Sequence, residues 1–342
     1  MHFPESGDII SMIETAENIK QHNFYRRKFV MGRKVLIFGA TGEIGSRIAN
    51  LAVKAGHTVI GACRGMQHSC QGYVDLSGVE FVRGNKYDHD YLDKLASYKP
   101  EVIIDTLGNE SMIPLIEKHF PNVENVMFCS STGSFVPLQY FPANEEHPWR
   151  EDTGLNFFHQ SQWDIKALNE CAAGRFPITI LRPTNIIGET VCPLELWGGR
   201  NIEFYKKLKN NEPLFIPPCL DIMVQSGYNW DLASAFALAI DHPDEVRGEI
   251  FIISSKKAVT LKTFLDTAMK HLNSSSEVIV VPNEDLIRIY PEIRIHFGLD
   301  FLELHMCFDI GKAQRILGYD PKVSTTEGLV RALTWLEENG KL

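Results

Sequence analysis

The sequence lacks the features that mark membrane-spanning, disulfide-stabilised and zinc-binding proteins. Its 342 residues contain seven cysteines, an odd number, and no C-x-x-C pair. No apolar run is long enough to span a bilayer. His296 and His305 stand nine residues apart without a spaced ligand set, so no metal site is expected. These absences favour a reduced, cytoplasmic, globular chain.

An excess of basic residues is also lacking. The formal net charge is −9 and 23% of the residues are charged, which argues against a nucleic acid or an anionic membrane as partner. A small-molecule substrate is the partner that this composition favours. Residues 1–30 are expected to form an N-terminal extension with a helical apolar stripe, ahead of a domain that begins near Gly32.

A glycine-rich turn follows the first apolar run, Val35–Phe38. Gly39, Gly42 and Gly45 let the chain turn tightly, let backbone N–H groups approach a phosphate, and let a helix pack close to the strand. Apolar residues then recur at helical spacing up to Gly56, and a second strand follows. The segment therefore predicts a dinucleotide site, whose phosphate-binding residues are Gly39, Thr41, Gly42, Glu43, Ile44 and Gly45.

Acidic residues are missing where an NAD-binding protein usually has one. An Asp or Glu about twenty residues after the first glycine holds the ribose 2′-hydroxyl, yet none occurs between Glu43 and Asp75. The second strand ends instead in Ala62-Cys63-Arg64-Gly65. Because an arginine at this place suits a 2′-phosphate, the sequence favours NADP(H) over NAD(H).

Apolar strand-like runs recur along the chain between helical patterns, at 34–39, 57–62, 79–82, 101–105, 125–129, 178–181 and 249–253. This alternation predicts an α/β fold, a Rossmann-type doubly wound parallel sheet. The less regular segments predict a smaller C-terminal substrate-binding subdomain over the carboxyl edge of the sheet. We assign 33–184 plus about 229–255 to the dinucleotide-binding domain and 185–228 plus 256–342 to the subdomain.

Several ordered motifs between residues 33 and 342 resemble those of one superfamily. They are the glycine loop at 39–45, Val126-Met-Phe-Cys-Ser-Ser-Thr132, Leu181-Arg-Pro-Thr-Asn-Ile-Ile-Gly188, Asn229-Trp-Asp-Leu-Ala233 and the stretch from Phe308 to Tyr319. Together they resemble the short-chain dehydrogenase/reductase superfamily, in its extended and atypical branches that include nucleotide-sugar epimerases and dehydratases.

The resemblance implies roles for particular residues. Ser131 takes the position of the active-site serine, and Lys166 that of the lysine that holds the nicotinamide ribose. Pro183 and Asn185 belong to the segment that passes the nicotinamide, and Asn85 stands where the superfamily commonly has an aspartate near the adenine. Because homodimers are frequent among the relatives, a second copy of the chain is a further candidate partner besides the small-molecule substrate.

The catalytic tyrosine of the superfamily is missing. Its Tyr-x-x-x-Lys motif reads Gln162-Trp-Asp-Ile-Lys166 here. A glutamine amide can orient a substrate oxygen, but it does not titrate near neutral pH and cannot serve as an ordinary acid or base. His159 and Tyr140 are the first candidates for the proton source, and Tyr228 and Lys166 are further ones.

Three functions stay open on this evidence. The first is an NADP(H)-dependent oxidoreductase with non-standard proton transfer, acting on a small polar or aromatic metabolite. The second is an epimerase, dehydratase or other isomerase with tightly held NAD(P), although the segment before Asn229 lacks the arginine that clamps a sugar diphosphate. The third is a catalytically silent module that binds a nucleotide or RNA. Aromatic residues near the expected cleft suit an apolar or planar substrate; they are Phe135, Tyr140, Phe157, Phe158, Trp163, Trp197, Tyr228 and Trp230.

Overall fold

A seven-stranded parallel sheet forms the centre of the protein. The structure, a computed structural model, describes residues 32–65, 70, 72–150, 158–295 and 298–342, so the predicted extension at 1–30 lies outside the described residues. The strand order is β11-β6-β5-β4-β1-β2-β3. The strands are β1 (Lys34–Phe38), β2 (Thr58–Cys63), β3 (Val79–Arg83), β4 (Val102–Asp105), β5 (Asn125–Cys129), β6 (Ile178–Pro183) and β11 (Ile250–Ile253). The predicted doubly wound sheet is confirmed.

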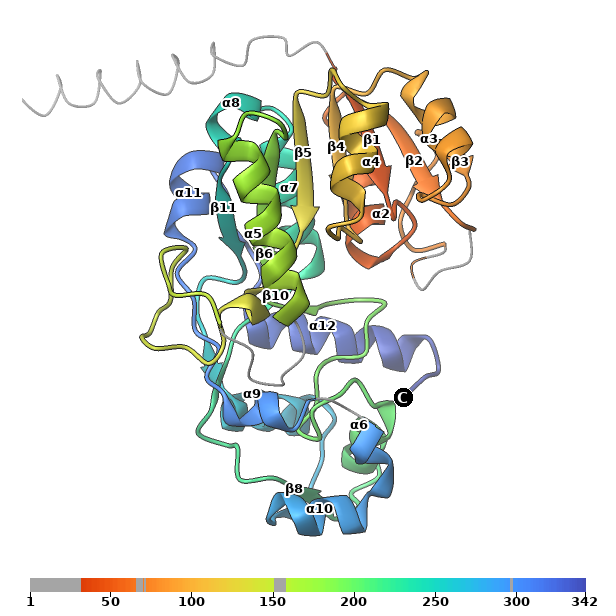
Figure 1. The fold of residues 1–342 in the computed structure, drawn as a ribbon. Coiled ribbons are helices and arrows are strands. Elements are labelled where there is room, and N and C mark those ends of the chain that lie inside the picture. The colour runs from red at the N-terminus through yellow and green to blue at the C-terminus, as the bar shows by residue number, and fades with distance from the viewer. Residues whose placement is uncertain (1–31, 66–69, 71, 151–157, 296–297) are drawn as a thin grey trace, which may run out of the picture.

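Helices cover both faces of this sheet (Figure 1). Successive residues of β1 point to opposite faces, so Val35 and Ile37 join one buried cluster while Leu36 and Phe38 join another. The first cluster includes residues of α2 (Glu43–Lys54), α7 (Asn229–Ala239), α8 (Pro243–Val246) and α11 (Gly311–Leu317). The second includes residues of α3 (His89–Ala96), α4 (Met112–His119) and α5 (Phe158–Ala172).

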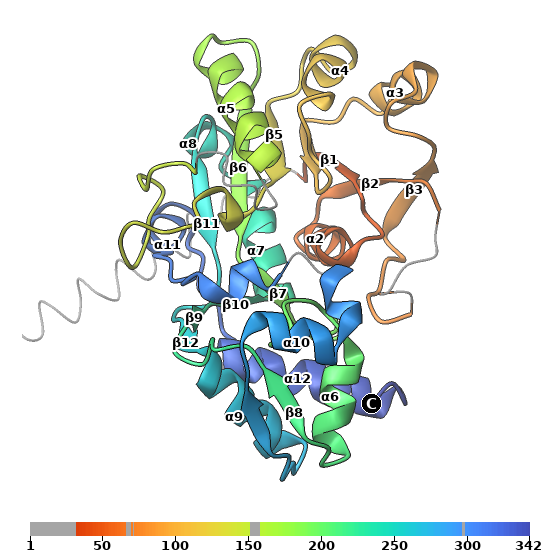
Figure 2. The same ribbon diagram turned by 60° about the horizontal axis from the view of Figure 1, so that its bottom comes forward.

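A smaller subdomain lies beyond the carboxyl ends of the strands (Figures 1 and 2). A third apolar cluster, which includes Trp197, Phe204, Phe264 and Leu333, forms its core. Its helices are α6 (Ile202–Lys209), α9 (Leu261–His271), α10 (Asn283–Ile289) and α12 (Thr325–Glu338). Short pairs join β7 (Asn185–Ile187) to β10 (Ser226–Tyr228), β9 (Met223–Val224) to β12 (Val259–Thr260) and β8 (Leu214–Ile216) to β13 (Val278–Val280). The 3-10 helices are η1 (Thr132–Ser134), η2 (Pro291–Ile295) and η3 (Asp300–Glu303).

One segment from the C-terminal part of the chain packs on the sheet domain. Helix α11 contacts β11 and α7, and Ala313, Leu317 and Tyr319 are buried in the same cluster as those elements. We assigned this segment to the subdomain, as part of 256–342, because that stretch lacks a regular alternation of strand and helix patterns. Its apolar stripe is buried against the sheet domain instead. Among the described helices, none is long and apolar enough to cross a membrane.

Helix α12, which lies beneath the carboxyl edge of the sheet (Figure 1), begins with a reciprocal pair of hydrogen bonds. Ser324 Oγ accepts from the Glu327 backbone N–H, and Glu327 Oε2 accepts from the Ser324 backbone N–H at 2.8 Å. We expect Ser324→Ala to lower the free energy of unfolding by about 1 kcal/mol, because the Glu327 backbone N–H loses its acceptor, Ser324 Oγ. Denaturant unfolding measures this.

The control is Ser111→Ala. Ser111 also stands at the N-cap of a helix, α4, but its side chain makes no capping hydrogen bond. Equal losses in the two variants would contradict the assigned role of Ser324.

Candidate cofactor and substrate site

The loop after β1 brings the backbone close to the start of α2. Gly39 has φ +80°, and a Cβ at Gly45 would lie only 2.2 Å from the Gly39 carbonyl oxygen. Neither position accepts a side chain without a backbone shift. Gly42 is the N-cap of α2 and supplies no side-chain acceptor to the first N–H groups of the helix. Those donors and the helix dipole therefore face the cleft, as an anion site requires.

A cavity of about 780 Å³ extends from this loop over the carboxyl ends of β1, β2 and β3. Its volume lies within the range of sites that bind cofactors. It brings together eight of the predicted cofactor-binding residues: Gly39, Thr41, Gly42, Glu43, Ile44, Gly45, Arg64 and Asn85. Lys86 and Tyr87, which the sequence analysis did not select, also line it.

Two arginines near this cavity have different surroundings. Arg64 is exposed at the end of β2 and lines the cavity. Arg47 of α2 is fully buried; its Nη1 lies 2.7 Å from Glu43 Oε1 and its Nη2 donates to Thr190 Oγ1 at 3.1 Å. Of these two arginines, Arg64 is therefore the one that a ligand in the first cavity can contact.

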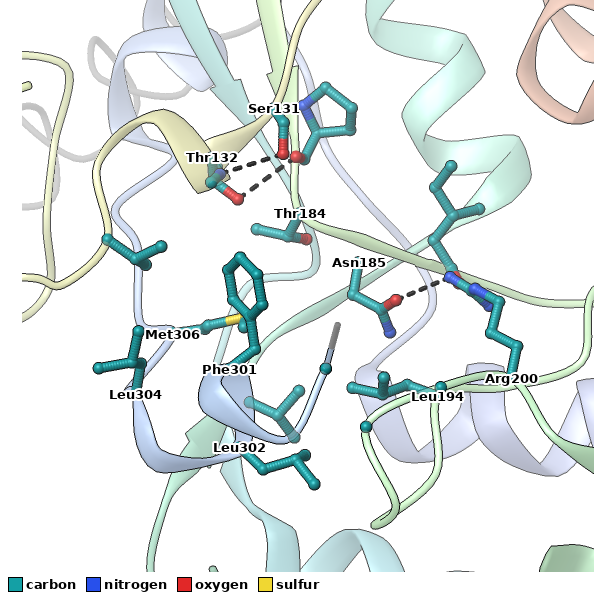
Figure 3. A pocket seen from close by; sticks show the side chains of 18 of the residues that line it. Ser131, Thr132, Thr184, Asn185, Leu194, Arg200, Phe301, Leu302, Leu304 and Met306 are labelled. Atoms are coloured by element: carbon teal, nitrogen blue, oxygen red, sulfur yellow. Dashed lines mark hydrogen bonds between the residues drawn. The ribbon is translucent and has the colours of Figure 1, made fainter. Parts of the chain in front are cut away.

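A second cavity of about 550 Å³ adjoins the first (Figure 3). Thr106, Cys129 and Ile186 line both cavities, so the two adjoin at the ends of β4 and β5. Three predicted residues, Ser131, Pro183 and Asn185, line this second cavity. Ser131 Oγ accepts a hydrogen bond from the Gly133 backbone N–H at 3.0 Å, which fixes the direction of its hydroxyl group.

The opposite wall of the second cavity is apolar (Figure 3). It is formed by Met223, Leu261, Phe301, Leu302, Leu304 and Met306, among others. Arg200 is the single charged side chain among the described residues that line it. Its guanidinium donates to Asn185 Oδ1 at 2.7 Å and to the Ile186 and Cys192 carbonyls. The cavity therefore suits a ligand with an apolar body and few charges.

The aromatic lining predicted from sequence differs from this wall. Phe135 is buried in the first apolar cluster and Trp197 in the third. Tyr228 is also buried, and its hydroxyl donates to Glu189 Oε1 at 3.2 Å. None of the predicted aromatic side chains that the structure describes lines the second cavity. Phe157 and the side chain of Phe158 lie outside the described part. Residues of η3 and the segment after it supply the wall instead.

The four remaining catalytic candidates do not line either cavity within the described ranges. His159 and Gln162 are exposed on α5. Lys166 has 49% of its side chain exposed, and its Nζ lies 3.6 Å from Glu110 Oε2. The Tyr140 hydroxyl donates to Asn144 Oδ1 at 2.8 Å. Their proposed roles stay predictions. Gln160, one turn before Asp164, lines the second cavity instead.

Sequence reasoning missed a buried charge pair behind the second cavity. Arg182 donates from Nε and Nη2 to Asp164 Oδ2 at 3.1 and 2.9 Å. Its guanidinium carbon lies 4.4 Å from the Phe135 ring centroid and 3.8 Å from that of Trp149. Ser130 Oγ donates to the same Asp164 oxygen at 2.5 Å. The sequence offered one signal for this pair. Arg182 stands in a mainly apolar strand, and a buried charge needs a partner of opposite charge.

No group of three or more His, Cys, Asp or Glu side chains suited to a metal occurs among the residues that the structure describes. Burial raises the pKa of the Cys129 thiol, at the junction of the cavities, to about 12, and Asp105 and Asp164 add to the shift. Cys129 is therefore protonated, and not a nucleophile, at neutral pH.

The chain is similar to one family model and to several known proteins. Residues 31–115 match the NmrA-like family. The chloroplast stem-loop binding protein of 41 kDa b from Arabidopsis thaliana is 26% identical, over 87% of this chain and 77% of that protein. A putative UDP-glucose 4-epimerase of Methanocaldococcus jannaschii is 24% identical, over 90% and 99%. A phenylcoumaran benzylic ether reductase of Nicotiana tabacum is 23% identical, over 75% and 80%.

Solved structures agree on the fold. The UDP-glucuronic acid 4-epimerase of Bacillus cereus, in complex with NAD, superposes with a TM-score of 0.68 at 17% identity, covering 90% of this chain and 99% of that one. The chain thus has the fold of the epimerase/dehydratase-type short-chain dehydrogenases/reductases, together with an NmrA-like segment. This confirms the resemblance that its motifs predicted.

The contact between Gly45 and Gly39 generates a prediction about the cofactor. We expect Gly45→Ala to raise the Kd for NADPH at least about tenfold, ~1.4 kcal/mol, because the added Cβ displaces the N–H groups that face the phosphates. Fluorescence titration measures the Kd.

Gly311→Ala is the matched control, because Gly311 lines neither cavity and a Cβ there would meet only the ends of the Asp309 and Arg315 side chains, at 2.9 and 3.0 Å. Unchanged affinity of the Gly45→Ala variant would contradict the placement of the phosphates at this loop.

Proposed function

We propose that the protein is an NADP(H)-dependent oxidoreductase of the atypical short-chain dehydrogenase/reductase type, acting on a small metabolite with an apolar or aromatic body. The observation that carries this proposal is that the two cavities adjoin, with Thr106, Cys129 and Ile186 lining both. A dinucleotide held at the glycine loop can extend along the first cavity to this junction. A substrate in the second cavity then meets it beside Ser131.

The residues of the first cavity fit NADP(H). The open N-terminus of α2 binds the pyrophosphate, and the guanidinium of Arg64 pairs with a 2′-phosphate. The nicotinamide supplies or accepts the hydride when the cofactor is bound. Lys86 is held by Asp105, to which its Nζ donates at 2.9 Å, so Arg64 carries most of the preference for NADP(H).

The residues of the second cavity orient the substrate. The hydroxyl of Ser131 donates to the reacting oxygen, since its own oxygen already accepts from Gly133. The apolar wall from Phe301 to Met306 holds the body of the substrate and excludes water. Asn185 and Arg200 stand at the rim and contact a polar end of the substrate.

Two alternative functions have weaker support. Epimerisation or dehydration with tightly held NAD(P) is favoured by the epimerases among the relatives, but the second cavity offers a sugar diphosphate only Arg200. A non-catalytic RNA-binding role is suggested by the stem-loop binding relative. The net charge of −9 argues against it. We therefore also propose a cytoplasmic protein whose partner is a small molecule rather than RNA or a membrane.

The test is a transfer assay with NADPH deuterated at nicotinamide C4 and a panel of aromatic aldehydes and ketones. The proposal predicts deuterium in the alcohol product and net consumption of NADPH. Copurified nucleotide without net consumption would favour an epimerase. Bound NADPH without any transfer of deuterium would contradict an enzymatic function of this type. Ser131→Ala should lower kcat at least about 100-fold.

The cofactor preference is tested at Arg64. We expect Arg64→Ala to raise the Kd for NADPH about 10- to 100-fold and to leave the Kd for NADH unchanged, because a charge-assisted hydrogen bond to phosphate contributes about 1.5–3 kcal/mol.

Arg83→Ala is the control. Arg83 is also exposed, at the end of the neighbouring strand β3, but it does not line the cavity. Equal effects on NADPH and NADH in Arg64→Ala would overturn the assigned preference.

A further inference from the structure

The second cavity has no side chain that exchanges a proton near neutral pH among its described lining residues. Its polar side chains belong to serines, threonines, Asn185, Gln160, Cys129 and Arg200. The pKa of Cys129 is raised to about 12 by burial, and a guanidinium does not release its proton. Carbonyl/alcohol chemistry requires a proton at the reacting oxygen. That proton therefore has to pass through one of the hydroxyl groups.

One of these hydroxyl groups leads to a carboxyl group. Ser130 lines the cavity next to Ser131, and only 6% of its surface is exposed. Its Oγ donates to Asp164 Oδ2 at 2.5 Å. Asp164 itself is buried on the inner face of α5, with 2% exposed. Ser130 thus connects the cavity to a carboxyl group that the substrate cannot reach directly.

Neighbouring side chains fix the position of Asp164 and shift the pKa of its carboxyl group. Arg182 of β6 makes two hydrogen bonds to Oδ2, and the Phe135 and Trp149 rings both pack against the guanidinium. The other titratable groups that act here are the Cys129 thiol of β5 and Glu145, which lies near Arg182. Burial raises the pKa of Asp164, while Arg182 and Ser130 oppose that shift.

We propose that Ser130 and Asp164 form the proton relay of this enzyme, with Ser130 as the catalytic residue that contacts the reacting oxygen and Asp164 as the proton store behind it. The relay takes the place of the tyrosine that the sequence lacks. This inference rests on the proposed oxidoreductase function. It differs from the sequence-based candidates, because His159, Gln162 and Tyr140 do not line the described cavity.

During alcohol oxidation, the relay takes the hydroxyl proton of the substrate while the cofactor takes the hydride. The C–H bond of the alcohol breaks, and the hydrogen leaves with its electron pair to the nicotinamide C4 of NADP⁺. The O–H bond breaks, its electron pair forms the C=O bond, and its proton passes to Ser130 Oγ. The former proton of Ser130 passes to Asp164 Oδ2, along the hydrogen bond already present. The alcohol is oxidised and NADP⁺ is reduced. Carbonyl reduction is the reverse.

Two variants test the relay: Ser130→Ala, which interrupts the path, and Asp164→Asn, which removes the proton store. With benzyl alcohol and 1-phenylethanol as probes, kcat/KM of the wild type should rise with pH as Asp164 loses its proton. Both variants should lose this rise, and kcat should fall at least about 100-fold. Ser130→Thr, which retains a hydroxyl group, should recover the pH dependence.

The control is Ser161→Ala. Ser161 is fully buried on α5, three residues before Asp164, and makes no hydrogen bond within the described structure. A loss of stability without a change of pH profile in Ser130→Ala would show a merely structural role and overturn the relay. Failure of the wild type itself to transfer hydride would instead contradict the proposed function.

A second readout does not depend on turnover. The infrared band of a protonated carboxyl group, identified as the one that Asp164→Asn removes, should titrate in the wild-type protein. In Ser130→Ala this titration should move to higher pH, because the carboxylate loses a donor. An unchanged titration would show that Ser130 does not bond Asp164 in solution and would also overturn the relay.

Discussion

The close contact between the loop after β1 and the start of α2 sets the position of the remaining site. With a Cβ at Gly45, the helix could not lie where it does, since the added atom would meet the Gly39 carbonyl at 2.2 Å. The helix in turn packs along α7. Its first residue, Glu43, accepts hydrogen bonds from Asn229 at 2.9 Å and Thr190 at 2.8 Å. The N-terminal end of α2 is thereby hydrogen-bonded to the loop that leads into the subdomain.

The second cavity and the layer behind it differ in charge. The second cavity is walled by neutral side chains apart from Arg200. The pair of Asp164 and Arg182 lies one layer deeper, where aromatic rings and the hydrogen bond from Ser130 compensate for burial. Such a pair is costly unless both partners are held in place. The hydrogen bond from Ser130 also links Asp164 to the second cavity, a contact that a purely structural ion pair would not need.

Much of the fold followed from the sequence, because the seven strands are short, mainly apolar runs that alternate with helical patterns and turns. The glycine loop and Arg64 were also predictable, since backbone geometry fixes where the ends of β1 and β2 lie. The contact of Ser130 with Asp164 was not, because it joins residues 34 positions apart and depends on the rotation of α5. The wall at Phe301–Met306 comes from η3 and an irregular segment, which have no periodic signal.

In our proposal, a dinucleotide at the glycine loop reaches the junction of the two cavities, where Ser131 and Ser130 meet the substrate. A crystal structure of the protein with NADP⁺ would locate the cofactor. We expect the pyrophosphate at the N-terminus of α2, the 2′-phosphate beside Arg64 and the nicotinamide ring between Thr106, Cys129 and Ile186. A nicotinamide ring bound away from that junction, or a cofactor that closes off the second cavity, would contradict it.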